Sequence, residues 1–342
     1  MLIITIDTGT SNTRVKLWQE GRFLSQSLVE VGVRDTAITG SREKLQTGVR
    51  RAILDAVKPA GVGIGAIDLL LASGMITSNV GLCEVPHVPA PAGLKELAQR
   101  MVKSRVDAVA EQPIWFVPGV KNKLGAVDLA DYEAMDIMRG EEVETFGLIE
   151  QLKLQGPAIF VLPGSHSKFI SLDAHNRITA CLTTLAGELL DIITGHTILA
   201  SAVGRSFAQE FDEAMLLEGA RCSASVGLGR ACFSVRILEL FGKDTPNQRA
   251  NFLLGAVLAQ DLMALRNSSA LQVNPEMTVV LTGRKIMQQA FRSLIGHDRF
   301  FRGKVMELDD HLTADLAALG AMAVARERGL MAKGAAADQR GS

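Results

Sequence analysis

Residues 158–177 read AIFVLPGSHSKFISLDAHNR, which is an apolar strand, a glycine-hydroxyl turn, a second strand and a polar reversal. Residues 4–22 read ITIDTGTSNTRVKLWQEGR and follow the same plan. The GSH of 164–166 matches the GTS of 9–11, and the AHNR and EGR reversals follow at the same distance to within about one residue. Hairpins are common enough for such a likeness to arise by chance. Because a helix and a strand follow each copy, a duplicated domain is favoured.

The segments between and after the two copies predict alternating helices and strands. One apolar helical face follows a candidate cap at Ser41 and consists of Leu45, Val49, Ala52, Ile53 and Ala56. IDLLLASGM (67–75) and PIWFVPGV (113–120) predict buried strands that end in glycine-containing loops. A helix is expected from about Arg139 to Lys153, and LQGP at 154–157 indicates a boundary. These elements predict an α/β protein with domains 1–154 and 155–330.

Two elements near the C-terminus complete the second half. MTVVLTGRKIMQQAF (277–291) predicts a strand, a glycine turn and a helix. ADLAALGAMAVARERG (314–329) predicts a helix whose small residues suit close helix packing. The last residues, 331–342, lack apolar periodicity and predict a disordered tail.

The composition predicts an ordinary soluble protein of the cytoplasm. The chain has 342 residues, 47% of them hydrophobic, which is enough for a sizeable core. Lys and Arg total 36 against 37 Asp and Glu, so no general field attracts nucleic acid or an anionic membrane. The four cysteines have no metal-binding spacing, and no apolar run reaches the roughly 18 residues of a membrane span. We therefore expect neither nucleic acid nor a membrane as a partner, and the sequence leaves a homodimer open.

The two turns together predict a site for a chain of phosphates. Backbone N–H groups and hydroxyls from both domains would converge on one cleft. Asp7 precedes the first turn, whereas Pro163 lies near the equivalent place in the second. A single carboxylate beside phosphate-binding amides suits a hydrated Mg²⁺, which takes only one or two carboxylates.

Six sequence boxes give the chain a family resemblance. They are TSNTR (10–14), ASGMITSNVGL (72–82), IMRGEE (137–142), LPGSHSKF (162–169), AGELL (186–190) and NFLLGAVLAQDL (251–262). The duplicated hairpins resemble the actin, Hsp70 and sugar-kinase superfold, and the boxes resemble the 2-dehydro-3-deoxygalactonokinases. The resemblance implies two similar ribonuclease-H-like domains that flank an ATP cleft. It also implies ATP-dependent phosphorylation of 2-dehydro-3-deoxy-D-galactonate to its 6-phosphate in galactonate catabolism.

The resemblance assigns the two turns to ATP. The expected phosphate- and ATP-binding residues are Asp7, Gly9, Thr10, Ser11, Asn12, Gly164, Ser165, His166, Lys168 and Gly283. Asp7 would hold Mg²⁺ through water, and Gly283 would let the backbone approach the nucleoside. Alternatively, Asp7 and Thr10 satisfy local backbone groups, His166 is structural, and Lys168 points to solvent.

The MRGEE box offers a catalytic base. Transfer of phosphate to an alcohol needs an acid that accepts the hydroxyl proton, and Glu141 is the first choice. Glu142 and Asp136 are the other candidates, with Asp136 expected about a helical turn upstream. Alternatively, the two glutamates only complement the helix dipole. Arg139 could bind the carboxylate of the substrate or one of these acids.

The acceptor side is expected in the loop after the second buried strand, where open sheets place ligands. Ser73, Gly74 and Asn79 are the candidates, together with Arg139 from the MRGEE box. The alternative is a glycine turn in which Asn79 caps the following segment. The competing functions are an exopolyphosphatase-like hydrolase, a kinase of a related sugar acid, and a silent sugar sensor.

Overall fold

The computed structural model describes residues 1–123, 125–309, 312 and 314–332, and these form two compact units. The first unit contains residues 1–123, 137–154 and 315–332. The second contains residues 125–136 and the described residues between 155 and 314. Within the described chain, no helix is both long and apolar enough to cross a lipid bilayer.

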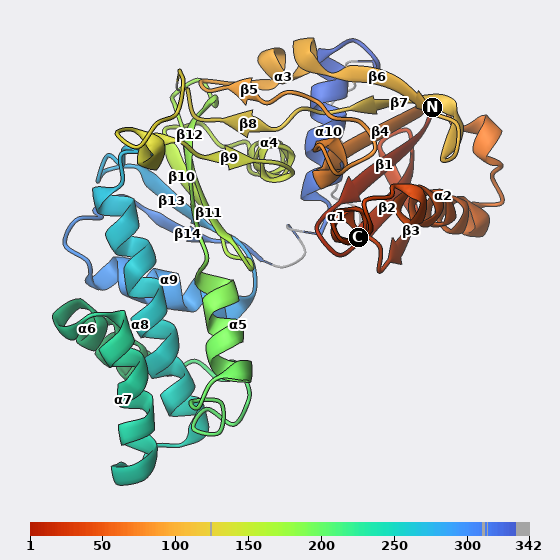
Figure 1. The fold of residues 1–342 in the computed structure, drawn as a ribbon. Helices are drawn as coiled ribbons and strands as arrows, with labels where there is room; N and C mark the ends of the chain where they lie inside the picture. The colour runs from red at the N-terminus through yellow and green to blue at the C-terminus, as the bar shows by residue number, and fades with distance from the viewer. Residues whose placement is uncertain (124, 310–311, 313, 333–342) are drawn as a thin grey trace, which may run out of the picture. The chain divides into compact units, whose positions relative to one another are not determined.

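Six strands form the main sheet of the first unit (Figure 1). Their order is β3 (Arg22–Val29), β2 (Thr13–Gln19), β1 (Leu2–Thr8), β4 (Leu69–Gly74), β7 (Ala110–Phe116) and β6 (Val102–Val106). The meander β1–β2–β3 is antiparallel, and β1, β4 and β7 are parallel. All residues of β4 are buried, as expected for a central strand covered on both faces.

Five strands form the sheet of the second unit, and they repeat this plan. Their order is β12 (Ile178–Thr184), β11 (Ser167–Leu172), β10 (Ala158–Leu162), β13 (Thr278–Leu281) and β14 (Val305–Glu307). The meander is again antiparallel, and β10, β13 and β14 are parallel. The predicted duplication is therefore confirmed over five strands, although few residues are identical between the two copies.

Two glycines fix the alignment of the copies. Gly74 and Gly283 follow equivalent strands and have φ values of +82° and +81°. A Cβ on Gly74 would lie 2.7 Å from the carbonyl oxygen of Thr8, and one on Gly283 would lie 3.4 Å from that of Pro163. Pro163 is thus equivalent to Thr8, and Leu162, one residue earlier than expected, is equivalent to Asp7. The carboxylate remains unmatched in the second copy.

Helices cover both faces of the first sheet. They are α1 (Val33–Thr39), α2 (Glu43–Val57), α3 (Leu94–Arg100), α4 (Glu141–Leu152) and α10 (Leu316–Glu327). Helix α2 packs on β2 and β3, and its predicted apolar face from Leu45 to Ala56 is buried. The N–H of Glu43 donates to the hydroxyl of the predicted cap Ser41. Helix α4 begins two residues after the predicted start because Gly140 has a φ of +111°.

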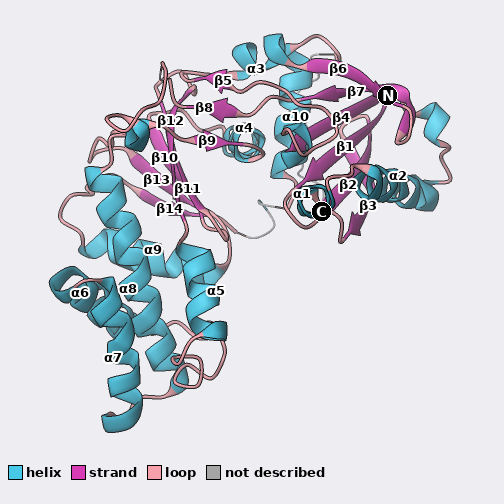
Figure 2. Ribbon diagram, viewed as in Figure 1, coloured by secondary structure: helices cyan, strands magenta, loops and turns pink. Residues whose placement is uncertain are grey.

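Five helices belong to the second unit (Figure 2). They are α5 (Ala186–His196), α6 (Glu213–Val226), α7 (Leu228–Phe241), α8 (Pro246–Asn267) and α9 (Lys285–His297). Helix α8 contacts the other four and carries more buried residues than any of them. A capping box of Thr245 and Gln248, with proline at the first helical position, explains its start.

Small elements complete the two units. A sheet of two-residue strands contains β5 (Val88–Pro89), β8 (Val120–Lys121) and β9 (Ile137–Met138). The 3₁₀ turns that lie wholly within the described residues are η1 (Lys58–Ala60), η2 (Ile64–Ala66), η3 (Met75–Thr77) and η4 (Tyr132–Ala134). Strand β9 leads directly into the MRGEE box.

Two segments belong to the other unit than the predicted domains 1–154 and 155–330 would place them in. Residues 125–136 belong to the second unit, and residues 315–332 belong to the first. The reason for the second difference is that the apolar face of α10 packs on α4, β1 and β4 (Figure 1). Of the predicted tail 331–342, residues 333–342 lie outside the described residues.

The contact between α4 and α10 depends on glycine. A Cβ on Gly320 would lie 1.7 Å from the carbonyl oxygen of Val143, and one on Gly147 would lie 2.2 Å from that of Leu316. The backbones of the two helices therefore touch at these positions. This confirms the predicted close packing of the small-residue helix.

We expect Gly320→Ala to destabilise the protein by about 1–3 kcal/mol, because the added methyl forces the two helices apart. Urea unfolding measures the change. The control is Gly296→Ala in α9, where a Cβ meets nothing within 4 Å. Alanine there should be neutral or stabilise by up to about 1 kcal/mol. Equal effects of the two substitutions would contradict the backbone contact.

Candidate active site

The first turn presents exposed hydroxyls on a fixed backbone. The N–H of Gly9 donates to the carbonyl of Asn12 at 2.9 Å. The N–H groups of Val33 and Arg34 donate to the carbonyls of Gly9 and Thr10 at 3.3 and 2.9 Å. In the described chain, no hydrogen bond joins the Asp7 or Thr10 side chain to this backbone, and Thr10 and Ser11 are exposed. The local Asx-type alternative is therefore not what the turn adopts.

Asp7 lies at the end of β1, beside Ser73 and Gly74, two of the residues that the sequence predicts to contact the acceptor. Its register partner on β4 is Ser73, which is buried. A Cβ on Gly74 would lie 2.9 Å from Oδ1 of Asp7, so only glycine leaves room there. Burial raises the pKa of the Asp7 carboxyl above its ordinary value, and the charges of Arg14 and Lys16 oppose this shift. The Arg14 guanidinium lies 3.7 Å from this carboxylate.

Gly140 of the MRGEE box packs against Gly74, which contacts Asp7. A Cβ on Gly140 would lie 3.4 Å from the Cα of Gly74. The start of α4 is therefore packed against the residue that contacts Asp7. Three separate boxes, around Asp7, Gly74 and Gly140, come together within the first unit.

The first turn of α4 carries three glutamates in different environments. Glu142 is fully buried, and its Oε2 accepts from the N–H of Gly140 at 2.8 Å. Burial, with the nearby Glu141 charge, raises the pKa of Glu142 well above its ordinary value. Glu141 is half-buried, and its Oε2 accepts from the N–H of Arg139 at 3.1 Å. Glu142 thus caps the helix from inside, whereas Glu141 lies nearer the surface.

Glu144 is electrostatically coupled to Asp7 and was not among the predicted site residues. It is half-buried, and burial together with the Asp7 and Glu141 charges raises its pKa to about 8. The spacing of three residues from Glu141 places both side chains on one face of α4. That spacing was visible in the EEVE sequence, but its closeness to Asp7 depends on the fold.

Arg139 holds the loop after β4 in place. Its guanidinium donates to the Thr77 hydroxyl at 2.7 Å and to the Val85 carbonyl at 2.8 Å, and it lies 3.3 Å from Nδ1 of His87. Burial lowers its pKa. Asn79, by contrast, is exposed, and its carbonyl accepts from Arg42 at 3.0 Å. Arg139 therefore fastens the loop after β4, while Asn79 lies on the outer side of that loop.

The second turn is clamped by the AGELL box. A Cβ on Gly187 would lie 2.0 Å from the carbonyl oxygen of Gly164, so this contact requires glycine. The N–H of Glu188 donates to the Ser165 carbonyl at 2.9 Å, and its carboxylate lies 3.0 Å from Nε2 of His166. His166 is exposed, so its ring lies at the surface of the turn.

Two expected site residues lie behind this turn instead of in it. Lys168 is buried, and it contacts the hydroxyl of Thr183 and the carboxylate of Asp136. Asp136 was expected a helical turn before Glu141, but it precedes β9 and belongs to the second unit. Neither side chain points to open solvent.

Buried polar side chains lie where β11 and β12 end next to the turn, on the face of the sheet opposite to Lys168 and Thr183. Ser167 and Thr184 are partners in the β11–β12 register, and Asp261 of α8 lies beside Thr184. An oxygen of each side chain is buried without a well-formed hydrogen bond. Burial raises the pKa of Asp261 to about 7, against the opposing effect of Thr184.

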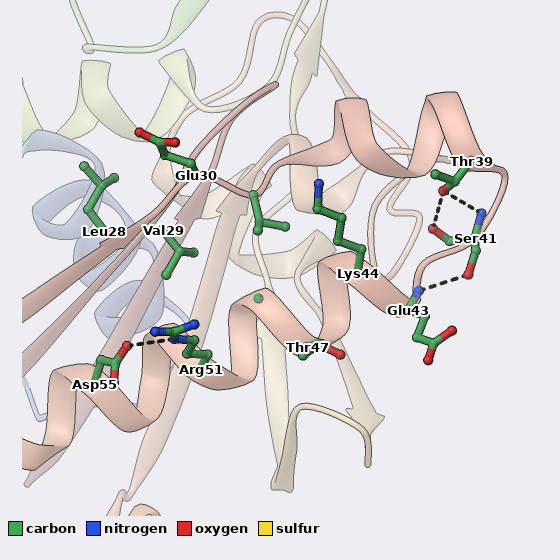
Figure 3. A pocket seen from close by; sticks show the side chains of 12 residues that line it. Leu28, Val29, Glu30, Thr39, Ser41, Glu43, Lys44, Thr47, Arg51 and Asp55 are labelled. Atoms are coloured by element: carbon green, nitrogen blue, oxygen red, sulfur yellow. Dashed lines mark hydrogen bonds and ion pairs between the residues drawn. The ribbon is translucent and has the colours of Figure 1, made fainter.

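A groove elsewhere in the first unit contains none of the expected site residues (Figure 3). It lies between the end of β3 and α2, and Figure 3 shows the Arg51–Asp55 ion pair along it. It is therefore separate from the site around Asp7.

The duplicated sheets and the paired glycine-hydroxyl turns define the actin-like ATPase and sugar-kinase superfold. A family model described as 2-keto-3-deoxy-galactonokinase matches residues 7–318, and the chain belongs to this family. The 2-dehydro-3-deoxygalactonokinase of Escherichia coli K12 is 26% identical over 297 residues, which cover 85% of this chain and 89% of the relative. The probable 2-dehydro-3-deoxygalactonokinase DgoK1 of Rhizobium meliloti is 31% identical over 206 residues, or 59% of each chain.

Solved structures agree with this fold. A crystal structure of a putative 2-dehydro-3-deoxygalactonokinase from Sinorhizobium meliloti has a TM-score of 0.71 at 23% identity and covers 95% of this chain and 96% of that chain. Component A of the (R)-2-hydroxyglutaryl-CoA dehydratase from Acidaminococcus fermentans has a TM-score of 0.50 at 14% identity, with 96% and 99% covered. These likenesses establish the fold.

We expect Asp261→Asn to stabilise the protein more as the pH rises. The raised pKa means that the contribution of this carboxyl to stability is full below its ordinary value of 3.8 and is lost as the pH rises towards about 7. The loss is roughly 1.4 kcal/mol per pH unit within this window. Asparagine keeps the shape and cannot ionise.

Urea unfolding of both proteins between pH 5 and pH 8 tests this expectation. Asp191→Asn removes an exposed carboxylate from helix α5 and controls for the change in net charge. A stability difference between Asp261→Asn and the unmodified protein that is constant across this range would contradict the buried, protonated carboxyl.

Proposed function

We propose that this protein is an ATP-dependent kinase that phosphorylates 2-dehydro-3-deoxy-D-galactonate at its 6-hydroxyl. The observation that carries the proposal is the convergence of Asp7, Gly74 and Gly140, because it joins an acid, an acceptor loop and a candidate base. The family membership and the name of the Escherichia coli relative support the same substrate. ATP and a sugar acid meet in the cytoplasm, so we place the reaction there.

Asp7 is proposed to hold Mg²⁺ through water. The fit rests on the donor set, since the partly exposed carboxylate of Asp7 lies at the end of β1, and the exposed hydroxyls of Thr10 and Ser11 follow in the turn. One carboxylate beside hydroxyls suits a hard cation that keeps several waters. When bound, the ion would offset the negative charge of the phosphates. Gly9, Thr10, Ser11 and Asn12 would bind those phosphates from the first turn.

Glu141 is proposed as the base. It lies at the start of α4, and its half-buried carboxylate is held by the N–H of Arg139. A carboxylate of this kind can accept the proton of the acceptor hydroxyl as the oxygen attacks the γ-phosphorus. Glu142 is less suited because its side chain is fully buried and is bound to the N–H of Gly140.

The remaining roles follow from position. Ser73 and Gly74 are proposed to contact the acceptor, with Arg139 fixing their loop. Gly164, Ser165 and His166 are proposed to bind phosphate from the second turn, and Gly283 to approach the nucleoside. Lys168 and Asp136 are placed behind the turn by their mutual contact, so we assign them no contact with ATP.

A coupled assay of ATP consumption tests the function. We expect turnover with 2-dehydro-3-deoxy-D-galactonate and little without an acceptor, since hydrolysis requires water to replace the alcohol. The epimeric acid derived from gluconate is the matched comparison, because it differs only in stereochemistry. Rapid phosphate release without any sugar acid would instead indicate a phosphohydrolase.

Replacing Glu141 with Gln should lower kcat on the order of 10²–10⁴-fold while ATP binding stays near normal, because the amide cannot accept the proton. Steady-state kinetics and a direct titration with ATP separate the two effects. Glu150→Gln, near the far end of α4, is the control. Near-normal turnover of the Glu141 variant would move the base to another acid, with Glu144 the first to examine.

A further inference from the structure

Residues 125–136 form a strap on the second unit, although the chain on either side belongs to the first. Two carboxylates attach this strap. Glu133 accepts from the N–H of Ser269 at 2.9 Å and from the hydroxyls of Ser268 and Ser269. Asp136, its last residue, is attached separately to the β11–β12 hairpin.

The attachment of Asp136 is the tighter of the two. Its Oδ2 accepts from the N–H of Thr183 at 2.6 Å, and its Oδ1 accepts from the Thr183 hydroxyl at 2.7 Å. Nζ of Lys168 lies 3.8 Å from the same carboxylate, and both of these charged side chains are at least 85% buried. Hydrogen bonds to a buried carboxylate are among the stronger ones in proteins. The strap therefore ends in a fixed point.

The fixed point lies directly behind the second turn. Lys168 and Thr183 are register partners, and the next pair, Ser167 and Thr184, is the last pair of β11 and β12, directly after the turn that precedes β11. If phosphate binding displaces the turn, the displacement would pass through Ser167 and Thr184 to Lys168 and Thr183, and from these to Asp136. Charge alone does not explain the arrangement, because Thr183 supplies two direct hydrogen bonds.

The other end of the connection is the MRGEE box. Only four residues separate Asp136 from Glu141, so the two lie within about 18 Å of each other along even a fully extended chain. Two of the four, Ile137 and Met138, are held in β9 by pairing with β8. The third is Arg139, which binds the acceptor loop at Thr77. The connection has little slack to absorb a displacement.

We propose that Asp136 is a positioning residue that couples phosphate binding at the second turn to the acceptor loop and Glu141. This inference rests on the proposed kinase function. Asp136 does not touch the substrate; it relays the state of the β11–β12 hairpin to the box that holds the base. A residue that only fastened a linker would change stability but not the dependence of one substrate's affinity on the other.

Calorimetric titration measures this coupling. The probes are a non-hydrolysable ATP analogue with Mg²⁺ and 2-dehydro-3-deoxy-D-galactonate, each titrated with and without the other. In the unmodified protein, we expect the analogue to raise the affinity for the sugar acid about 5-fold or more, and the reverse effect to be equal. In Asp136→Asn, both ligands should bind alone with little change, but the mutual enhancement should fall to about 1-fold.

Two further comparisons keep the test decisive. Thr183→Val should lose most of the enhancement and Thr183→Ser should retain it, because serine keeps the hydroxyl that donates to Asp136. This pair also replaces Asp136→Asn if that variant does not fold. Glu133→Gln weakens the strap elsewhere and should leave the enhancement unchanged.

The outcomes separate the two proposals. Failure of the unmodified protein to bind the analogue or the sugar acid would refute the proposed function. Binding of both, with the same enhancement in Asp136→Asn and Thr183→Val, would refute the coupling alone. Equal loss of enhancement in Glu133→Gln would also overturn it, because the effect would then belong to the strap as a whole.

Discussion

The first unit depends on the space left by a missing side chain at Gly74. The strand β4 runs parallel to β1 and brings this residue against the Thr8 carbonyl and the Asp7 carboxylate. The start of α4 then packs against Gly74 from another direction through Gly140. Any Cβ at Gly74 would have to displace the end of β1, where Thr8 is fully buried. The acid, the loop and the helix can meet only because this residue is glycine.

The second unit has the same architecture, but different residues lie beside its turn. Its equivalent glycine, Gly283, also has a positive φ, but it faces Pro163, and Leu162 replaces the acid. Carboxylates are instead found below the turn, where Asp136 and Asp261 lie on opposite faces of one hairpin end. One copy of the duplicated plan thus has a partly exposed acid beside the turn, and the other has buried acids behind the turn.

Much of this fold was predictable from local pattern. The strands of both meanders and the apolar face of α2 follow periods that burial imposes on a chain. What local pattern could not predict is the choice of distant partners. Lys16 is buried in a strand because it pairs with Asp315, 299 positions later. Likewise, three glutamates within one helical turn look alike in sequence, and only the surrounding packing makes Glu142 a buried cap and leaves Glu141 near the surface.

The return of α10 to the first unit has a consequence for biosynthesis. Val143 and Gly147 of α4 pack against backbone of α10, which follows the whole second unit in the sequence. The first unit therefore cannot complete its core until the second unit has been synthesised, although its sheet is made first. The second unit is encoded entirely before α10, so it can reach its final packing while the N-terminal sheet still waits, incompletely covered, for its last helix.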